Sequence, residues 1–434
     1  MTGRRAARLL CGLGLGLGVL AAAAPAGGHA DVEWSSPAAG ASLPTAPDRV
    51  VLVFEERPDP ILSSVEVLDS GGAAVATGPL GAAPGRPDGL VRAVTALPDG
   101  AYTVTWRAVS ATDGHLETGS YRFGVRSPVA ASPASERAAG PTWAGVGARS
   151  VYEAGVLGLI GLAFVGLFVF RTAPEPVLRW GLGLSWAAAV AGALGLAASQ
   201  ASVDGAGLGR LLSSSAGPSA AARGAPLLEA ALAIGAALAW RGKWRRAALA
   251  GVGAYAALSM LADARAGHAA AAKSWAWLHV AVLWTHFLAV GVWIGGLVAV
   301  LACLPGVAPG RRAAGLVRYS GVAVVAVLAV ALTGVVEAVA EVPSGRALVS
   351  TGFGRVVLVK GGVIVVLAAL GAVNRYRNVP RAARSAAPLR RVALAEVGIA
   401  AFALVAAAVL PGFDPRAPAV APEPLPPVAA VATG

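Results

Sequence analysis

The five histidines of this 434-residue chain are the side chains best suited to bind a metal ion. Two of them, His29 and His115, lie in the first third of the chain, and His115 ends an Asp113-Gly114-His115 sequence. A histidine at a processed N-terminus offers its α-amine and its imidazole together. Asp113 and His115 add an oxygen and a second imidazole, and such ligands in a tetragonal arrangement suit Cu(II). The plainer interpretation is an exposed turn, because a D-x-H motif alone is weak.

The other three histidines lie at or within a later apolar run and predict a metal path through a membrane. His279 and His286 are seven residues apart, so on a helix they share one face, about 10 Å apart along the axis. His268 precedes that run, and Glu337 lies in the next one. Ionisable groups inside a membrane are costly and usually functional. We therefore expect a metal ion to pass along His268, His279, His286 and Glu337.

Other polar residues of the apolar runs have plainer expected roles. Asp263 and Lys360 are expected at the membrane interface, where long side chains reach water, and Lys360 is also expected to pair with an acidic neighbour such as Glu337. Asn374 and Arg375 are expected to cap and anchor the cytoplasmic end of their helix. Glu396, near the inner end of the last run, is either an exit group for the metal or an interfacial residue.

The composition indicates a membrane protein. Hydrophobic residues make up 56% of the chain and charged residues 13%, whereas soluble proteins carry about 25% charged residues. The net charge of +12 lies mostly in short loops between apolar runs, which argues for membrane orientation rather than nucleic-acid binding. Two cysteines and two methionines leave no disulfide framework, thiolate cluster or thioether-rich Cu(I) site.

The chain divides into five parts by sequence pattern. Residues 1–28 predict a signal peptide. Residues 29–126 carry short β-prone runs separated by turn residues and predict an all-β sandwich. Residues 127–149 predict a linker, residues 150–411 a bundle of eight transmembrane helices, and residues 412–434 a Pro-rich tail. The eight apolar runs lie near 151–170, 180–199, 226–240, 247–262, 276–303, 319–340, 356–374 and 392–411.

The loop charges predict which side of the membrane each part faces. One set of alternating loops carries fifteen Lys and Arg residues and the other set seven, among them Arg223. The first set is therefore expected in the cytoplasm. The β domain, the loop with His268 and the C-terminal tail are then extracytoplasmic, and the signal peptide requires the same orientation. We expect a multi-pass protein of the plasma (inner) membrane.

The first part of the chain resembles the CopC family of periplasmic copper-binding domains. This resemblance implies a cupredoxin-like or Ig-like β-sandwich whose Cu(II) ligands are His29, Asp113 and His115, with Glu56 as an accessory residue. The methionine-rich Cu(I) segment of some relatives has no counterpart here. The stretches that carry the resemblance are His29-Ala30, Ser35-Ser36-Pro37-Ala38, Phe54-Glu55-Glu56, Tyr102 to Val109 and Asp113-Gly114-His115.

The membrane part, over roughly residues 240–410, resembles the CopD copper-resistance family. The whole chain is thus similar to a CopC–CopD fusion of the bacterial copper-uptake type. In this part of the chain, Gly295 and Gly296 are expected to let two helices approach each other closely. The matching stretches are Gly267-His268-Ala269-Ala270, His286-Phe287-Leu288-Ala289, Val292-Trp293-Ile294-Gly295-Gly296-Leu297, Leu332-Thr333-Gly334-Val335, Thr351-Gly352-Phe353-Gly354-Arg355 with Lys360, and Asn374-Arg375.

The leading hypothesis is a copper importer that captures Cu(II) outside and passes copper inward. Its partners are copper, the lipid bilayer and a copper chaperone in the periplasm or cytoplasm, with no nucleic acid. No Walker A sequence is present, so we expect a transporter without ATP hydrolysis rather than an enzyme. Two alternatives stay open. His279 and His286 could ligate haem in an electron-transfer protein or cupric reductase, or the chain could be a copper resistance or sensing protein that transports nothing.

Overall fold

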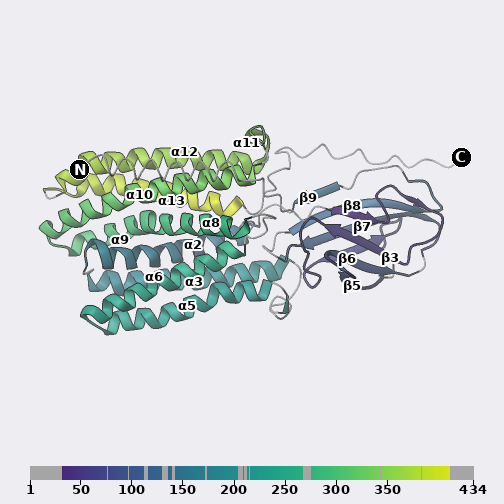
Figure 1. Ribbon diagram of the computed structural model, residues 1–434, viewed down its shortest axis with the longest axis horizontal. Coiled ribbons are helices and arrows are strands. Elements are labelled where there is room, and N and C mark those ends of the chain that lie inside the picture. Colours follow the sequence, from purple (N-terminus) through teal and green to yellow (C-terminus); the bar gives the residue numbers. More distant parts are fainter. Residues whose placement is uncertain are drawn as a thin grey trace.

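A β-sandwich and a helical bundle lie end to end in the computed structural model (Figure 1). The sandwich is formed by the N-terminal part of the chain and the bundle by the rest. The structure describes residues 32–75, 77–95, 97–111, 116–129, 135–138, 142–171, 174–203, 209, 213–214, 216–266, 275–342, 344–382 and 384–410.

The sandwich consists of two sheets that enclose one apolar core. Alternation of side chains along each strand places Leu52 and Phe54 from one sheet, and Val104, Trp106 and Phe123 from the other, in this core. The first sheet has the order β1 (Val32–Ser36), β3 (Arg49–Phe54), β6 (Arg86–Val94) and β5 (Thr77–Ala83). The second has the order β2 (Ser42–Leu43), β8 (Leu116–Val125), β7 (Gly100–Val109) and β4 (Ser64–Leu68), with β9 (Ser135–Ala138) also paired to β8.

The predicted sandwich is confirmed, and the structure adds strands that the sequence pattern does not show. The five predicted runs correspond to β3, β4, β6, β7 and β8. Strand β5 has the sequence TGPLGAA, whose glycines and proline predict turns. Strand β9 and the first residues of α2 (Trp143–Phe164) fall inside the segment 127–149 predicted as a linker.

The bundle contains eight helical segments in the described part of the chain that are long and apolar enough to cross a membrane, as predicted. Three of them include a short π-helical stretch: η1 (Val165–Val169), η2 (Gly291–Gly295) and η4 (Asn374–Asn378). The remaining helices are α3 (Glu175–Val203), α5 (Ala216–Ala239), α6 (Gly242–Arg265), α8 (Ala276–Val290), α9 (Gly296–Cys303), η3 (Leu304–Gly306), α10 (Pro309–Glu341), α11 (Ala347–Ser350), α12 (Gly352–Val373), η5 (Val379–Arg381) and α13 (Ala387–Val409).

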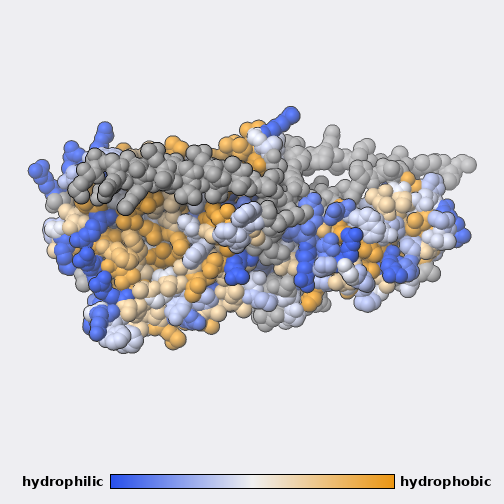
Figure 2. Space-filling model, viewed as in Figure 1, coloured by the Kyte–Doolittle hydropathy of each residue, from blue (hydrophilic) through white to orange (hydrophobic). Residues whose placement is uncertain are grey.

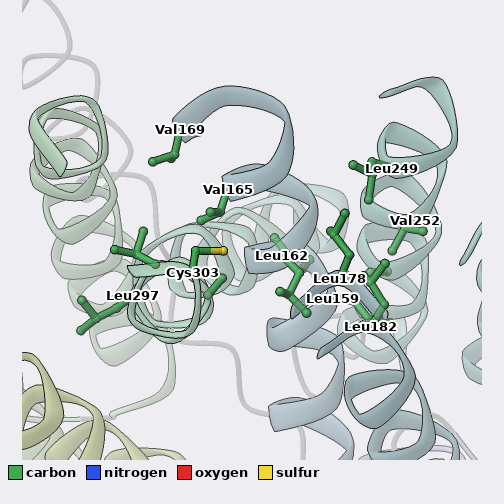
Figure 3. Packing of buried hydrophobic residues seen from close by; sticks show 14 of the residues in the cluster. Leu159, Leu162, Val165, Val169, Leu178, Leu182, Leu249, Val252, Leu297 and Cys303 are labelled. Carbon is green, nitrogen blue, oxygen red and sulfur yellow. The ribbon is translucent and has the colours of Figure 1, made fainter. Parts of the chain in front are cut away.

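Helix α2 lies in the core of the bundle and touches α3, α6, η2, α9 and α13. Figure 3 shows Leu159 and Leu162 of α2 packed among residues of the neighbouring helices. At the crossing with η2, a Cβ on Gly161 would lie 2.0 Å from the carbonyl carbon of Gly295. A Cβ on Gly295 would lie 2.0 Å from the carbonyl oxygen of Leu157. Only glycine fits at both places, so the predicted close approach at this run is confirmed.

The sandwich contacts one end of the bundle, which we call the sandwich end; the opposite end is the far end. At the sandwich end, Leu62 and Val109 of the sandwich form a small buried cluster with Ala201 of α3. Helices α2, α5, α8 and α12 begin at this end, because the chain alternates in direction through the bundle. Apolar residues cover the middle of the bundle surface, while hydrophilic residues gather at the far end and over the sandwich (Figure 2).

Candidate metal centre and membrane path

Glu56 marks one end of the sandwich as a candidate metal centre. Its side chain is 8% exposed, and its Oε2 accepts a 2.7 Å hydrogen bond from Ser110 Oγ. Ser110 directly follows β7, whose last residue Val109 pairs with Leu116 of β8. The connection that begins at Ser110 therefore carries Asp113 and His115, which themselves lie outside the described residues.

The beginning of β1 lies at the same end of the sandwich. Val32 pairs with Phe54 in antiparallel register, so the chain before Val32 leads toward the end of β3 that continues into Glu56. His29 precedes Val32 by three residues and lies outside the described part of the chain. The fold thus brings together the described ends of the segments that carry the predicted ligands, and it places Glu56 between them.

This end of the sandwich is also the end that meets the bundle. Backbone hydrogen bonds from Asp59 N to Val109 O (2.7 Å) and from Ala111 N to Arg57 O (2.9 Å) tie the chain after Glu56 to the end of β7. Leu62 and Val109 then pack against Ala201. The predicted capture end therefore lies close to the sandwich end of α3.

In the bundle, His286 is held by Thr333 of α10. The distance between His286 Nδ1 and Thr333 Oγ1 is 2.8 Å. The Thr333 hydroxyl donates to the carbonyl oxygen of Ala329 at 2.6 Å. Since a hydroxyl has one proton to give, His286 Nδ1 is the donor to Thr333. Its Nε2 then keeps a lone pair, which is the arrangement of a metal-ligating histidine oriented by a neighbouring group.

Two charged residues, Glu337 and Lys360, belong to the same region of the bundle as His286. Glu337 lies one turn of α10 beyond Thr333, toward the sandwich end. The charge of Lys360 on α12 interacts with His286 and with Glu337, Glu341 and Glu153. Acidic residues therefore lie near enough to Lys360 to act on its charge, while its direct pairing with Glu337 stays a prediction.

The predicted membrane residues form a sequence of positions rather than one cluster. His279 is buried near the beginning of α8, two turns before His286, and His268 lies outside the described residues. Within the described ranges, no three His, Cys, Asp or Glu side chains are grouped closely enough to hold a metal ion. Along α8 and α10, His279 and Glu337 thus lie nearer the sandwich end than His286.

A buried ion network near the sandwich end was not expected from the sequence. Asp263 is 5% exposed and binds Arg149 at 3.2 Å and Arg223 at 2.8 Å. The prediction that Asp263 lies at the interface in contact with water is therefore wrong, because two arginines neutralise it inside the protein. Arg223 lies within α5 rather than in a loop. The sequence does contain one indication of this network. Arg149 and Glu153 are four residues apart at the start of an apolar run, which is the spacing of an ion pair on one helix face.

A second polar group lies nearer the far end. Asn374 Nδ2 donates to Glu396 Oε1 across 2.6 Å, so its side chain joins α13 instead of capping its own helix. Glu396 is 3% exposed and is not an interfacial residue. Arg375 anchors this end of its helix, as expected. Its Nη1 donates to the carbonyl oxygen and to Oγ of Ser320 on α10.

Comparisons with known proteins identify both parts of the chain. The CopC domain model matches residues 32–126, and the Copper resistance protein D (CopD) model matches residues 313–410. The CopD match includes Glu337, Lys360 and Glu396 but begins after His286. None of the curated proteins searched matches the chain.

Two solved structures align with the sandwich. CopC from Methylosinus trichosporium OB3b is 32% identical over 22% of this chain and 93% of that protein, with a TM-score of 0.21. PcoC, a methionine-rich copper resistance protein from Escherichia coli, is 30% identical over 23% of this chain and 99% of that protein, with a TM-score of 0.21. By the family models, the chain belongs to the copper-resistance families as a fusion of a CopC domain, residues 32–126, to a helical part that matches CopD over residues 313–410.

Proposed function

We propose that this chain captures Cu(II) outside the plasma (inner) membrane and moves copper inward. The observation that carries the proposal is the position of the Glu56 end of the sandwich. The segments leading to His29 and to the Asp113–His115 pair start at this end, and the same end packs on α3 through Leu62 and Val109. A metal ion captured there lies next to the sandwich end of the bundle.

His29 lies three positions before Val32, and Asp113 lies three positions after Ser110. Each segment can span about 10 Å at most, so both reach the surroundings of Glu56. With residues 1–28 removed as a signal peptide, the α-amine and imidazole of His29 chelate Cu(II), and Asp113 and His115 complete a nitrogen and oxygen ligand set. Glu56 is an accessory carboxylate, and the methionine-poor chain offers no thioether site for Cu(I) in this domain.

Copper then passes from the sandwich to His268 and His279, and from there past Glu337 to His286. The nitrogen that receives it is Nε2 of His286, which keeps its lone pair when Nδ1 donates to Thr333. Inward movement of a cation is driven by the membrane potential, which contributes about 2.3 kcal/mol per charge for each 100 mV. A copper chaperone on either side is the expected further partner.

The test has two parts. The domain beginning at His29 is titrated with Cu(II), its N-terminus being verified by mass spectrometry, and copper uptake is measured in cells with the wild-type chain or with His286→Ala. We expect one tight tetragonal Cu(II) site in the domain and loss of uptake in the variant. Cell copper unchanged by deletion of the whole chain would instead indicate a non-transporting resistance or sensing protein. Haem absorbance in the purified protein would indicate electron transfer.

A further inference from the structure

Glu396 is a carboxylate buried inside the bundle without a cationic partner. It lies nine residues into α13, about 14 Å along the helix axis from the far end, and is 3% exposed. No Lys or Arg among the described residues forms a salt bridge with it, although such bridges are present at Glu153, Glu175 and Asp263. A buried charge without a partner is costly, so this carboxylate needs a proton or another cation.

A chain of amide groups connects Glu396 to the far end of the bundle. Asn378 Nδ2 donates to Asn374 Oδ1 across 2.8 Å, and Asn374 Nδ2 donates to Glu396 Oε1. The nearest cationic residue of this segment, Arg375, is directed to Ser320 of α10 instead. An amide that turns its NH₂ group toward the carboxylate stabilises it by hydrogen bonding but offers it no positive charge.

On the side away from Asn374, residues near Glu396 connect it with the membrane span that carries His286. The titratable group of α10 that interacts with Glu396 is Tyr319, whose Oη donates to Trp293 O in η2 across 2.6 Å. Trp293 lies seven residues after His286, two turns farther along the same span. From α9, the buried thiol of Cys303 belongs to the same core cluster as Ala393 of α13. Glu396 therefore lies on the far-end side of His286 and is connected with the span of His286 through Tyr319 and Trp293.

We propose that Glu396 is a proton-binding site on the copper path, which holds a proton and exchanges it for the passing copper ion. This inference rests on the proposed transport function. When a copper cation reaches the carboxyl group, the O–H bond breaks, the carboxylate oxygen contacts the cation, and the proton is taken up by solvent water at the far end of the bundle. No electron is transferred. Each exchange releases one proton at Glu396, so copper movement and proton movement are linked there.

The experiment uses dicyclohexylcarbodiimide on the purified full chain in lipid nanodiscs at neutral pH. This reagent reacts with protonated carboxyl groups in apolar surroundings. One carbodiimide nitrogen takes the proton and the carboxylate adds to the central carbon, giving an O-acylisourea that rearranges to a stable N-acylurea. Peptide mass spectrometry locates the adduct. The reaction is repeated with cupric chloride, and with cupric chloride and ascorbate to supply Cu(I).

We expect an adduct on Glu396 that is lost when copper is present in at least one oxidation state. Glu396→Gln should lose the adduct, while Glu396→Asp, which keeps the acid, should retain it. Glu175, which is half exposed and ion-paired, is the internal control and should stay unlabelled. An unlabelled Glu396 in the wild-type chain would overturn the proposal, and so would labelling that neither copper state reduces. Uptake into cells is measured separately, so a failure of transport is distinguished from a failure of this site.

Discussion

Arg223 of α5 donates from Nε to Asp263 Oδ1 of α6 across 2.8 Å, and both side chains are buried. Arg149 of α2 binds the other oxygen of the same carboxylate. One carboxylate therefore joins three helices at the sandwich end of the bundle. A buried charge that loses its partner is left uncompensated, which makes this network a sensitive point of the fold.

Asp263→Asn should destabilise the full chain by about 3–5 kcal/mol, because two arginines then lose their buried counter-charge. The matched control is Glu175→Gln, since Glu175 is half exposed and also binds two arginines, Arg241 and Arg245. Loss of the Glu175 charge should lower the free energy of unfolding by less than about 1 kcal/mol. Thermal unfolding of the purified protein followed by circular dichroism compares the two. Equal melting temperatures would show that burial of the network contributes no stability.

Gly295→Ala should destabilise the bundle by about 1–3 kcal/mol, because its methyl group would overlap the carbonyl oxygen of Leu157 and force α2 and η2 apart. Gly183→Ala in α3 is the control, since nothing lies within 4 Å of the added Cβ. There alanine should stabilise the helix by up to about 1 kcal/mol. The same unfolding measurement applies, and opposite signs for the two variants are the expected result.

Asp113→Ala or His115→Ala should weaken Cu(II) binding by the isolated sandwich domain, and an extra residue before His29 should do the same. Glu56→Gln should weaken binding by about 10- to 100-fold, as expected for a supporting residue. Glu66→Gln, an exposed residue of β4, is the control. Copper titration with electron paramagnetic resonance measures all of them. Unchanged affinity in the Asp113 and His115 variants would remove these ligands.

Thr333→Val should reduce copper uptake by about 10- to 100-fold, because His286 loses the acceptor that orients its ring. The control is Thr285→Val on α8, where the exposed hydroxyl only bonds its own helix at Ala281 O. Copper binding by the sandwich should be the same in both variants. Uptake that Thr333→Val leaves intact would show that His286 needs no such orientation.

Burial raises the pKa of Tyr121 in the sandwich core above its ordinary value of 10.0. The folded domain therefore favours the neutral phenol, and this contribution to stability is complete below about pH 10. It is lost as the pH rises further, because the unfolded chain then releases the proton more readily. Denaturant unfolding of the domain across this range should show the decline, and Tyr121→Phe should reduce it. A decline of the same size in the variant would assign it to other groups, such as Tyr102.

The sequence predicts the architecture well because its signals are long and periodic. Eight apolar runs correspond to eight spans, and five β-prone runs correspond to five strands. The short strands escape prediction, since β5 contains glycine and proline and is held by its pairing with β6. Helix ends also differ, because charged residues such as Arg149 continue α2 beyond its apolar run.

The candidate site is harder to predict from the sequence, because the role of each polar side chain depends on partners that lie far away along the chain. Residue spacing places His279 and His286 on one helix face, but it does not reveal that Thr333 holds His286. Asp263 looks interfacial until Arg223, 40 residues away, is seen beside it. Glu396 has the same difficulty, because Asn374 reaches it across the interface of two helices.

Strand β9 has a consequence for how the two parts of the molecule meet. It pairs along β8 from Glu117 to Ser120 and ends at Ala138, and only four residues separate it from Trp143 of α2. The five Cα-to-Cα steps from Ala138 to Trp143 span at most about 18 Å. So short a tether holds the sandwich near the bundle at an effective concentration on the order of millimolar. A free copy of the sandwich at micromolar levels would compete poorly, so under the proposed function each copper ion would be presented to the membrane by the same molecule that captured it.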